Sequence, residues 1–497
     1  MEQGTRWKRL RLGNQPDKPA FELLVLGCGG GPVGSNLSSY LVKPAAQRWS
    51  EGCIGLEAGS TLGAIVSLAE RDSTLFADFF PTHEHDTSMK GERRSDGVDE
   101  TPQESERDRK ARALRTGGVV WDAITASVTT APRPVPARRP RSSRQVVLAS
   151  QEGEGRAFFA SEWTPSSRRL IPAFETPVSK ADTLRLRFFV ITHGHLDHIA
   201  GLVISSALCR PQVKPIYGVE HTIANIERAM DGGVWPVLGA REKSKEGKGL
   251  AYQYRVIEAP ISQSIPLSSA LSFSALPVAH GPNPSTSVAT PASLASHSKS
   301  DSTKSSSDVY HSTAVFLREE VSKREFLFFG DVEPDSVSGT DLNRKVWTAA
   351  ASKIVAGSLD VIFIECSYPS SQPRAQLFGH LSPPYVMEEL AVLEELVVAS
   401  RGTKGGAADA KGGPLAGVTV VITHIKDELY LPPPDTAPSS ATSDPTTSAA
   451  AASIEAKYPR ERETVHERIE RELNELERER GTGVRFVLAE QGMRLEI

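Results

Sequence analysis

The chain has 497 residues, with 57 Lys and Arg against 61 Asp and Glu, and this formal net charge of -4 gives no global attraction to DNA or RNA. Its four cysteines are dispersed without a Cys-x-x-Cys pair, which argues against a disulfide framework and favours a reducing compartment such as the cytoplasm. The polar N-terminal segment does not resemble a signal peptide, and no apolar run reaches the ~18 residues of a membrane span, so we expect no membrane partner.

The first predicted elements belong to a sheet. Phe21–Leu26 is an apolar run that ends in the glycine-rich segment Gly27–Pro32, a pattern typical of a buried strand followed by a tight turn. Ser35–Val42 is a second ordered piece. Ile54–Ser60 continues the predicted sheet, and Thr61–Glu70 is an expected helix.

Three stretches interrupt this pattern. Charged residues, Ser and Pro dominate residues 87–144, Ser and Thr dominate 282–308, and Pro, Ser, Thr and Ala dominate 433–453. Such compositions bury too little apolar surface to offset the entropy lost on ordering, so we expect disordered insertions. The sequence therefore predicts a single domain over residues 1–497 that carries three low-complexity insertions.

Strands and helices alternate along the rest of the chain. Leu184–Thr192 predicts a strand, and four later apolar runs have the length of buried strands. These runs are Ala314–Leu317, Phe326–Phe329, Val361–Ile364 and Val418–Ile422. Tyr385–Ala399 and Glu461–Arg480 are expected helices, the second with a densely charged, solvated face. This alternation indicates an α/β fold.

A cluster of ligand-type residues follows the strand that ends at Thr192, in the segment His193-Gly194-His195-Leu196-Asp197-His198. Three imidazoles and a carboxylate within one short loop suit zinc or a similar divalent ion. His193 and His195 can share one side of the extended chain, whereas Asp197 and His198 lie in the turn that starts the next helix. The loop can thus supply two neighbouring metals. A polar surface turn is the alternative, although it would leave four costly polar side chains at a buried strand end.

Three further residues stand at the ends of predicted strands, where α/β folds place their sites. They are His280, Asp331 and His424. The two carboxylate oxygens of Asp331 allow it to bridge a pair of ions. A hydrogen-bonded polar residue that caps a strand is the alternative for each of the three. Their joint occurrence favours a binuclear metal site.

The succession of the 193–198 segment, His280, Asp331 and His424 resembles that of the metallo-β-lactamase superfamily. This resemblance implies an αββα sandwich with two metal ions at one edge. Several further stretches are similar to one branch of it, the class II cyclic-nucleotide phosphodiesterases, which hydrolyse 3′,5′-cyclic nucleotides to 5′-nucleotides. These stretches are Gly27–Val42, His193–Gly201, Trp235–Pro236, Gly330–Asp335, Glu365–Tyr368, Leu377–Leu381 and Ile422–Lys426. The match runs discontinuously from about Phe21 to Ile497 and skips the insertions.

The resemblance also implies individual roles. One ion is bound by His193, His195 and His280, the other by Asp197, His198 and His424, and Asp331 bridges them. Two divalent ions, most readily zinc, would lower the pKa of a bound water toward neutrality and so supply hydroxide for attack on phosphorus. Asp197 is expected to hold that hydroxide in line.

His380 lies in a Gly-His-Leu-Ser context that resembles the position where related phosphodiesterases keep a histidine that is not a metal ligand. The ribose 3′-oxygen leaves as an alkoxide unless it is protonated, so we expect His380 to act as general acid or electrostatic partner. A helix-capping or surface position is the alternative. Glu57 departs from the superfamily pattern, in which Asp is expected, and its role beside the ligands stays open.

These features together predict metal-dependent hydrolysis of cAMP, with cGMP as a second substrate, in cyclic-nucleotide signalling. Two alternatives remain. One is a tRNA 3′-end endonuclease of the same superfamily, which shares the His380 and His424 arrangement, although the acidic net charge and the lack of a basic RNA-binding arm argue against it. The other is a binding protein without catalysis, against which every expected ligand position is filled.

Overall fold

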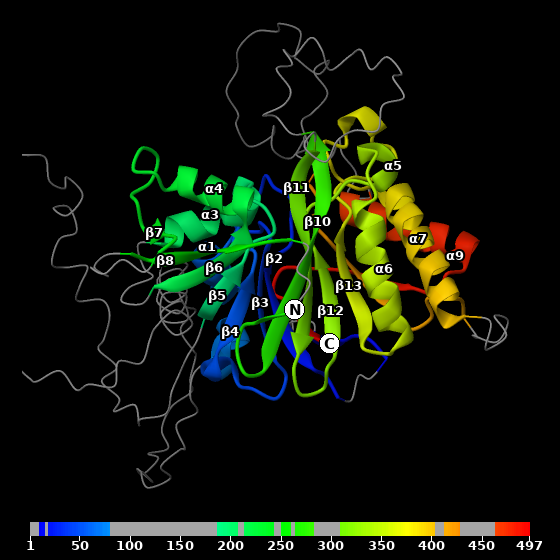
Figure 1. The fold of residues 1–497 in the computed structure, drawn as a ribbon, viewed down its shortest axis with the longest axis horizontal. Coiled ribbons are helices and arrows are strands. Elements are labelled where there is room, and N and C mark those ends of the chain that lie inside the picture. The colour runs from blue at the N-terminus through cyan, green and yellow to red at the C-terminus, as the bar shows by residue number, and fades with distance from the viewer. Residues whose placement is uncertain are drawn as a thin grey trace, which may run out of the picture.

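The computed structural model describes residues 9–14, 18–79, 186–206, 213–242, 250–259, 264–282, 309–402, 412–427 and 463–497. Within these ranges the chain forms two β-sheets packed face to face, with helices on both outer faces (Figure 1). The αββα sandwich expected from the sequence is thereby confirmed. The insertions predicted at 87–144 and 433–453 lie outside the described residues, as does the one at 282–308 except for Pro282.

The first sheet is built mainly from the N-terminal part of the described chain. Its nine described strands lie in the order β1-β16-β2-β3-β4-β5-β6-β8-β7. Their bounds are β1 Arg9–Arg11, β2 Phe21–Gly27, β3 Ser39–Pro44, β4 Cys53–Leu56, β5 Leu186–Val190, β6 Lys214–Val219, β7 Gly239–Ala240, β8 Tyr252–Ile257 and β16 Arg494–Glu496. β4, β5, β6 and β8 are parallel, so their carboxyl ends meet at one edge of the sheet.

The second sheet has seven described strands in the order β15-β14-β13-β12-β11-β10-β9. Their bounds are β9 Ile265–Pro266, β10 Leu271–Pro282, β11 Val309–Glu319, β12 Glu325–Phe329, β13 Leu359–Glu365, β14 Thr419–Thr423 and β15 Arg485–Leu488. The strands from β12 to β15 are parallel, whereas β10 and β11 form an antiparallel pair. The loops that follow β12, β13 and β14 therefore emerge at the same edge.

Helices cover the two outer faces of the sandwich (Figure 1). The first sheet carries α1 (Leu62–Arg71), α3 (Leu196–Ser205) and α4 (Glu220–Ala229), and the second carries α6 (Leu342–Val355), α7 (Pro383–Arg401) and α9 (Val465–Arg480), with the short α5 (Asp335–Ser338) before α6. Among the described helices, none has the length and apolar character needed to cross a membrane.

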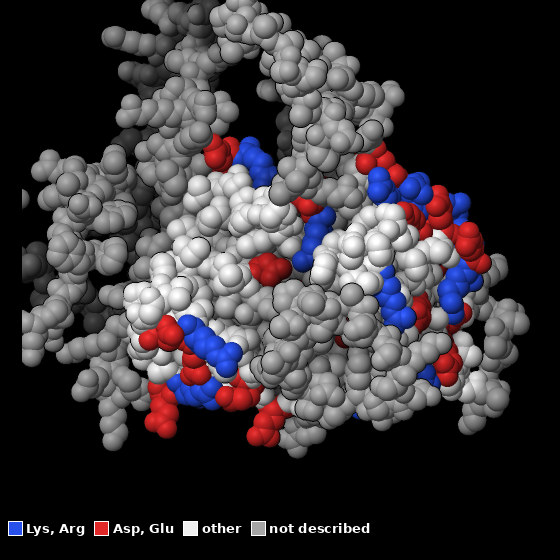
Figure 2. All heavy atoms as spheres, turned by 90° about the horizontal axis from the view of Figure 1, so that it is seen from above, with Lys and Arg blue, Asp and Glu red and all other residues white. Residues whose placement is uncertain are grey.

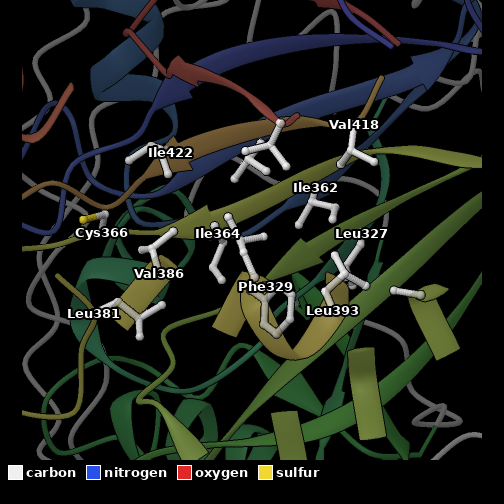
Figure 3. Packing of buried hydrophobic residues seen from close by; sticks show 14 of the residues in the cluster. Leu327, Phe329, Ile362, Ile364, Cys366, Leu381, Val386, Leu393, Val418 and Ile422 are labelled. Carbon is white, nitrogen blue, oxygen red and sulfur yellow. The ribbon is translucent and has the colours of Figure 1, made fainter. Parts of the chain in front are cut away.

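The packing of β12 shows why a fully apolar segment forms a central strand. Successive side chains of a strand point to opposite faces. Leu327 and Phe329 pack under the helices of the second sheet (Figure 3), while Phe326 and Phe328 pack in the layer between the two sheets. All four are buried, and burying one such side chain contributes about 1.5–3 kcal/mol. Both faces of the strand therefore hold the sandwich together.

The predicted strands and helices are confirmed, except that the end of one predicted strand is wrong. The sequence placed His280 at the end of a predicted strand, whereas β10 includes His280 and continues to Pro282. The strand is longer because β11 pairs with it as far as Val309, across an irregularity after Ala279. Pro282 accordingly belongs to the sheet rather than to the insertion.

Candidate metal centre

The seven residues predicted as metal ligands lie together at the edge where the carboxyl ends of the parallel strands meet. They form two groups, one of His193, His195, His280 and Asp331 and one of Asp197, His198, Asp331 and His424. In each group the ligand-type atoms lie within 4.8 Å of one another. Figure 2, seen from above the view of Figure 1, shows a small acidic patch near the centre, bordered by uncharged residues on one side and by basic residues on another. Both sheets contribute to the cluster.

Asp331 lies at the junction of the two groups, at the end of β12. Its Oδ2 is 3.6 Å from Nε2 of His193 and 3.6 Å from Nε2 of His280. Its Oδ1 is 3.2 Å from Nε2 of His198, and Oδ2 is 3.3 Å from Nε2 of His424. Ligands about 2 Å from a tetrahedral zinc are roughly 3.3 Å apart. The carboxylate thus has the spacing of a bridging ligand.

Hydrogen bonds fix the orientation of three imidazoles through the nitrogen that faces away from the cluster. Nδ1 of His280 donates to the carbonyl oxygen of Gly379 at 2.8 Å. Nδ1 of His193 lies 3.1 Å from Oγ1 of Thr192, and Nδ1 of His424 lies 3.0 Å from Oγ of Ser367. A proton on Nδ1 leaves Nε2 with a free lone pair, which is the form that binds a cation.

Burial keeps several of these imidazoles uncharged. Desolvation lowers the pKa of His193 well below its ordinary value and lowers the pKa of His280 to about 3. Partial desolvation also lowers the pKa of His195, although the residue still has a solvent-exposed side. Neutral imidazole is the ligand form of histidine, so these three side chains are in a metal-binding state at neutral pH.

His198 differs because two carboxylates flank it. Burial alone lowers its pKa, but Asp331 and Glu57 outweigh that effect and raise the pKa well above the ordinary value. Glu57 Oε1 lies 3.6 Å from Nδ1 of His198 and accepts a hydrogen bond from the backbone N–H of Thr192 at 3.2 Å. The longer acid therefore lies beside the ligand cluster, with its backbone at a φ of 60°. The two carboxylates therefore favour a positive charge at His198, carried either by a proton or by a metal ion bound there.

Unpaired buried atoms test whether a cation fits. Among the described residues, Nε2 of His193 and Oδ2 of Asp331 are buried and make no hydrogen bond. A buried polar atom without a partner costs about 1–3 kcal/mol. Both atoms belong to the first ligand group, and coordination to one cation would satisfy them together. The residues fit a divalent ion.

His380 lies beside the cluster but is oriented by a carboxylate. Its Nδ1 donates to Glu365, with distances of 2.9 and 3.0 Å to the two oxygens. Glu365 also accepts hydrogen bonds from the backbone N–H of Val332 at 2.7 Å and from the hydroxyl of Ser367 at 2.6 Å. Burial acts to raise the pKa of Glu365, but His380 and other nearby groups hold it below the ordinary value. Glu365 is thus an ionised hub that fixes His380.

Sequence reasoning assigned no role to Glu365 or to Tyr310. Glu365 ends β13, so the strand-end criterion that selected Asp331 applies to it as well. The ring of Tyr310 on β11 stacks on His195, with centroids 4.7 Å apart and planes 6° apart. Its hydroxyl accepts a hydrogen bond from Nδ2 of Asn225 on α4 at 3.0 Å. Nothing in the apolar pattern pointed to Tyr310, because it lies at the start of its strand.

We expect the stack on Tyr310 to hold His195, which is exposed, in its ligand geometry. Tyr310→Phe keeps the ring and loses only the hydroxyl, so metal affinity is expected to stay within a few-fold. Tyr310→Leu removes the stack and is expected to weaken binding about 10- to 100-fold. Competition with a coloured zinc chelator measures both. Equal affinities for the Leu variant and the unchanged protein contradict this role.

Gly30 shows why a glycine-rich turn adjoins the site. A Cβ at this position would lie 2.5 Å from Cε1 of His424, so only glycine allows the turn to pack against that imidazole. The backbone N–H of Gly30 donates to the carbonyl of Ile425 at 3.1 Å. The turn thus supports His424, in agreement with the tight turn predicted for the glycine-rich segment.

The fold and the cluster define an αββα protein with a histidine and carboxylate centre at one edge of the sandwich. The family model of the class-II cAMP phosphodiesterases matches residues 179–492, and the chain belongs to this family. It is 32% identical over 244 residues to a 3′,5′-cyclic-nucleotide phosphodiesterase of Schizosaccharomyces pombe, an alignment of 49% of this chain and 58% of that protein. A 3′,5′-cyclic-nucleotide phosphodiesterase of Aliivibrio fischeri is 29% identical over 246 residues, which are 49% of this chain and 61% of that protein.

These alignments span little more than half the length of the curated relatives. Among solved structures, unliganded yeast PDE1 superposes with a TM-score of 0.57 at 20% identity, covering 96% of this chain and 100% of that one. Because the two chains are only 20% identical, this similarity shows a shared fold and nothing about activity. It agrees with the two-sheet architecture described above.

Proposed function

We propose that the protein hydrolyses 3′,5′-cyclic nucleotides to nucleoside 5′-monophosphates, with cAMP as a substrate and cGMP as a second one, in cyclic-nucleotide signalling. The observation that carries the proposal is the convergence of six ligand-type side chains around the carboxylate of Asp331. The names of the relatives, 3′,5′-cyclic-nucleotide phosphodiesterases, support the substrate class. The substrate is then a small molecule rather than a nucleic acid.

The two ligand groups would hold two divalent ions, most readily zinc. His193, His195 and His280 hold one, Asp197, His198 and His424 hold the other, and Asp331 contacts both groups. When bound, such ions lower the pKa of water and neutralise charge on the phosphate oxygens. Imidazole and carboxylate ligands suit zinc, which they bind at about 2.0–2.2 Å.

The remaining steps fall to side chains of the chain. Asp197 is 23% exposed, so it is the carboxylate of the cluster most open to solvent, and its Oδ2 lies 3.1 Å from Nε2 of His424. We expect this carboxylate to accept a hydrogen bond from the attacking water and to keep that water in line. Because Nδ1 of His380 is bonded to Glu365, Nε2 is the nitrogen that would donate a proton to the departing 3′-oxygen.

Measurements on the purified full-length chain test the proposal. Metal content is expected near two ions per chain, and cAMP and cGMP are expected to give the 5′-monophosphates. Chelation should abolish turnover and zinc should restore it. A metal-loaded protein that turns over neither nucleotide contradicts the proposal, and cleavage of precursor tRNA instead would favour the nuclease alternative.

A further inference from the structure

We propose that Phe378, together with Leu196 and Val33, forms the subsite for the purine base of the substrate. This inference rests on the proposed function and deepens it. The three side chains are 70%, 70% and 42% exposed respectively. Among the large apolar residues exposed in the described part of the chain, Phe378 alone is aromatic.

Each of the three residues lies on a segment that touches the histidine cluster. Leu196 directly follows His195, whose Nδ1 lies 3.1 Å from Nε2 of His280. Val33 lies in the turn that begins with Gly30, which packs on His424. Phe378 precedes Gly379, whose carbonyl accepts the hydrogen bond from His280. The three exposed apolar residues therefore lie on three separate segments that each contact the histidine cluster.

The backbone of Phe378 argues that its ring serves something other than stability. The turn from Leu377 to His380 is closed by a hydrogen bond from the N–H of His380 to the carbonyl of Leu377 at 3.0 Å. Its two central residues, Phe378 and Gly379, have φ of 50° and 86°. Positive φ at both positions is the conformation of a type I′ turn, in which Asn, Asp and Gly are strongly preferred. A phenylalanine there is strained, and its exposed ring gains little from burial.

Strain and an exposed aromatic ring beside a reactive centre fit a ligand-binding role. The stacking face of an aromatic ring accepts any nucleobase, and such stacking is typically worth a 5- to 150-fold change in affinity. The exposed apolar residues would contact the base and the histidine cluster would bind the phosphate, so the two regions match the two ends of a cyclic nucleotide.

The test compares Phe378→Asn and Phe378→Tyr with the unchanged protein. Asn suits the turn but cannot stack, so the KM for cAMP is expected to rise about tenfold or more, while the melting temperature stays equal or rises. Tyr keeps the ring and should keep the KM. Ribose 3′,5′-cyclic phosphate without a base should be hydrolysed equally by all three. The control is Val321→Asn, because Val321 is 86% exposed and lies in the turn beyond the far end of β11.

The outcomes separate this inference from the proposed function. An unchanged KM for cAMP in Phe378→Asn, with normal turnover, overturns the base subsite alone. So does a fall in melting temperature together with an equal loss of activity on the base-free phosphate, because that result marks a structural residue. Absence of cAMP hydrolysis and of cAMP binding by the unchanged protein overturns both proposals.

Discussion

Asp331→Asn is expected to lower kcat/KM for cAMP by at least about 10³-fold, or about 4 kcal/mol in transition-state stabilisation. The substitution keeps the size of the side chain but removes its charge. An amide has one ligand oxygen, whereas the carboxylate lies within 3.6 Å of imidazole nitrogens from both groups. Metal content is therefore expected to fall from about two ions per chain to fewer than one. Elemental analysis and steady-state kinetics measure the two effects.

Asp341→Asn provides a matched control. Asp341 precedes α6, its side chain is 67% exposed, and it pairs with Lys345. Exposed ion pairs contribute little, and Asn is as good as Asp at a helix N-cap. This variant should keep its metal and its turnover. Retention of both ions and of activity in Asp331→Asn would show that another group bridges the site.

His380→Ala is expected to reduce kcat for cAMP by about 10²- to 10⁴-fold, the usual contribution of a general acid, while both ions are retained. The reason is geometric. Nδ1 of His380 is occupied by Glu365, and the ring lies 4.8 Å from that of His280 and 5.2 Å from that of His424. The imidazole thus lies at the cluster although it belongs to neither predicted ligand set, so its loss should affect proton transfer and leave metal binding intact.

The nature of the leaving group distinguishes this role from a structural one. A phosphodiester that releases p-nitrophenolate needs no proton on its leaving oxygen, so His380→Ala should hydrolyse it nearly as fast as the unchanged protein does. The comparison variant is His466→Ala, since the side chain of His466 on α9 is 36% exposed. An equal loss of activity on both substrates, or loss of metal, would remove His380 from the role of acid.

Most of the fold could be predicted from local patterns of apolar residues. β12, β13 and β14 are apolar on both faces and buried, so their composition alone marks them as central strands. The extension of β10 to Pro282 was missed because it depends on pairing with β11, a contact across residues 283–308 that no local pattern records. The longer strand changes the setting of His280 without moving it from the predicted cluster.

A residue of the candidate site could be predicted when its side chain is a typical metal ligand and it also follows a predicted strand. Asp331 and His424 combine a ligand side chain with a strand end, and the structure brings both to the 193–198 segment. Tyr310 lacks such a signal, since a tyrosine at the start of a strand is common and its stack on His195 appears only in three dimensions. Phe378 stands out through its φ of 50° and its exposed ring, neither of which the sequence reveals.

The candidate ligands come from opposite halves of the sandwich. The 193–198 segment follows β5 of the first sheet, whereas His280 lies in β10 of the second sheet and Asp331 and His424 follow its strands β12 and β14. An ion bound at this centre would link the two sheets through its ligands. Because ligand bound only to the native state stabilises it by RT ln(1 + [L]/Kd), cellular metal supply would govern the lifetime of the folded chain as well as its chemistry. Starvation for metal would then lower the abundance of the folded protein.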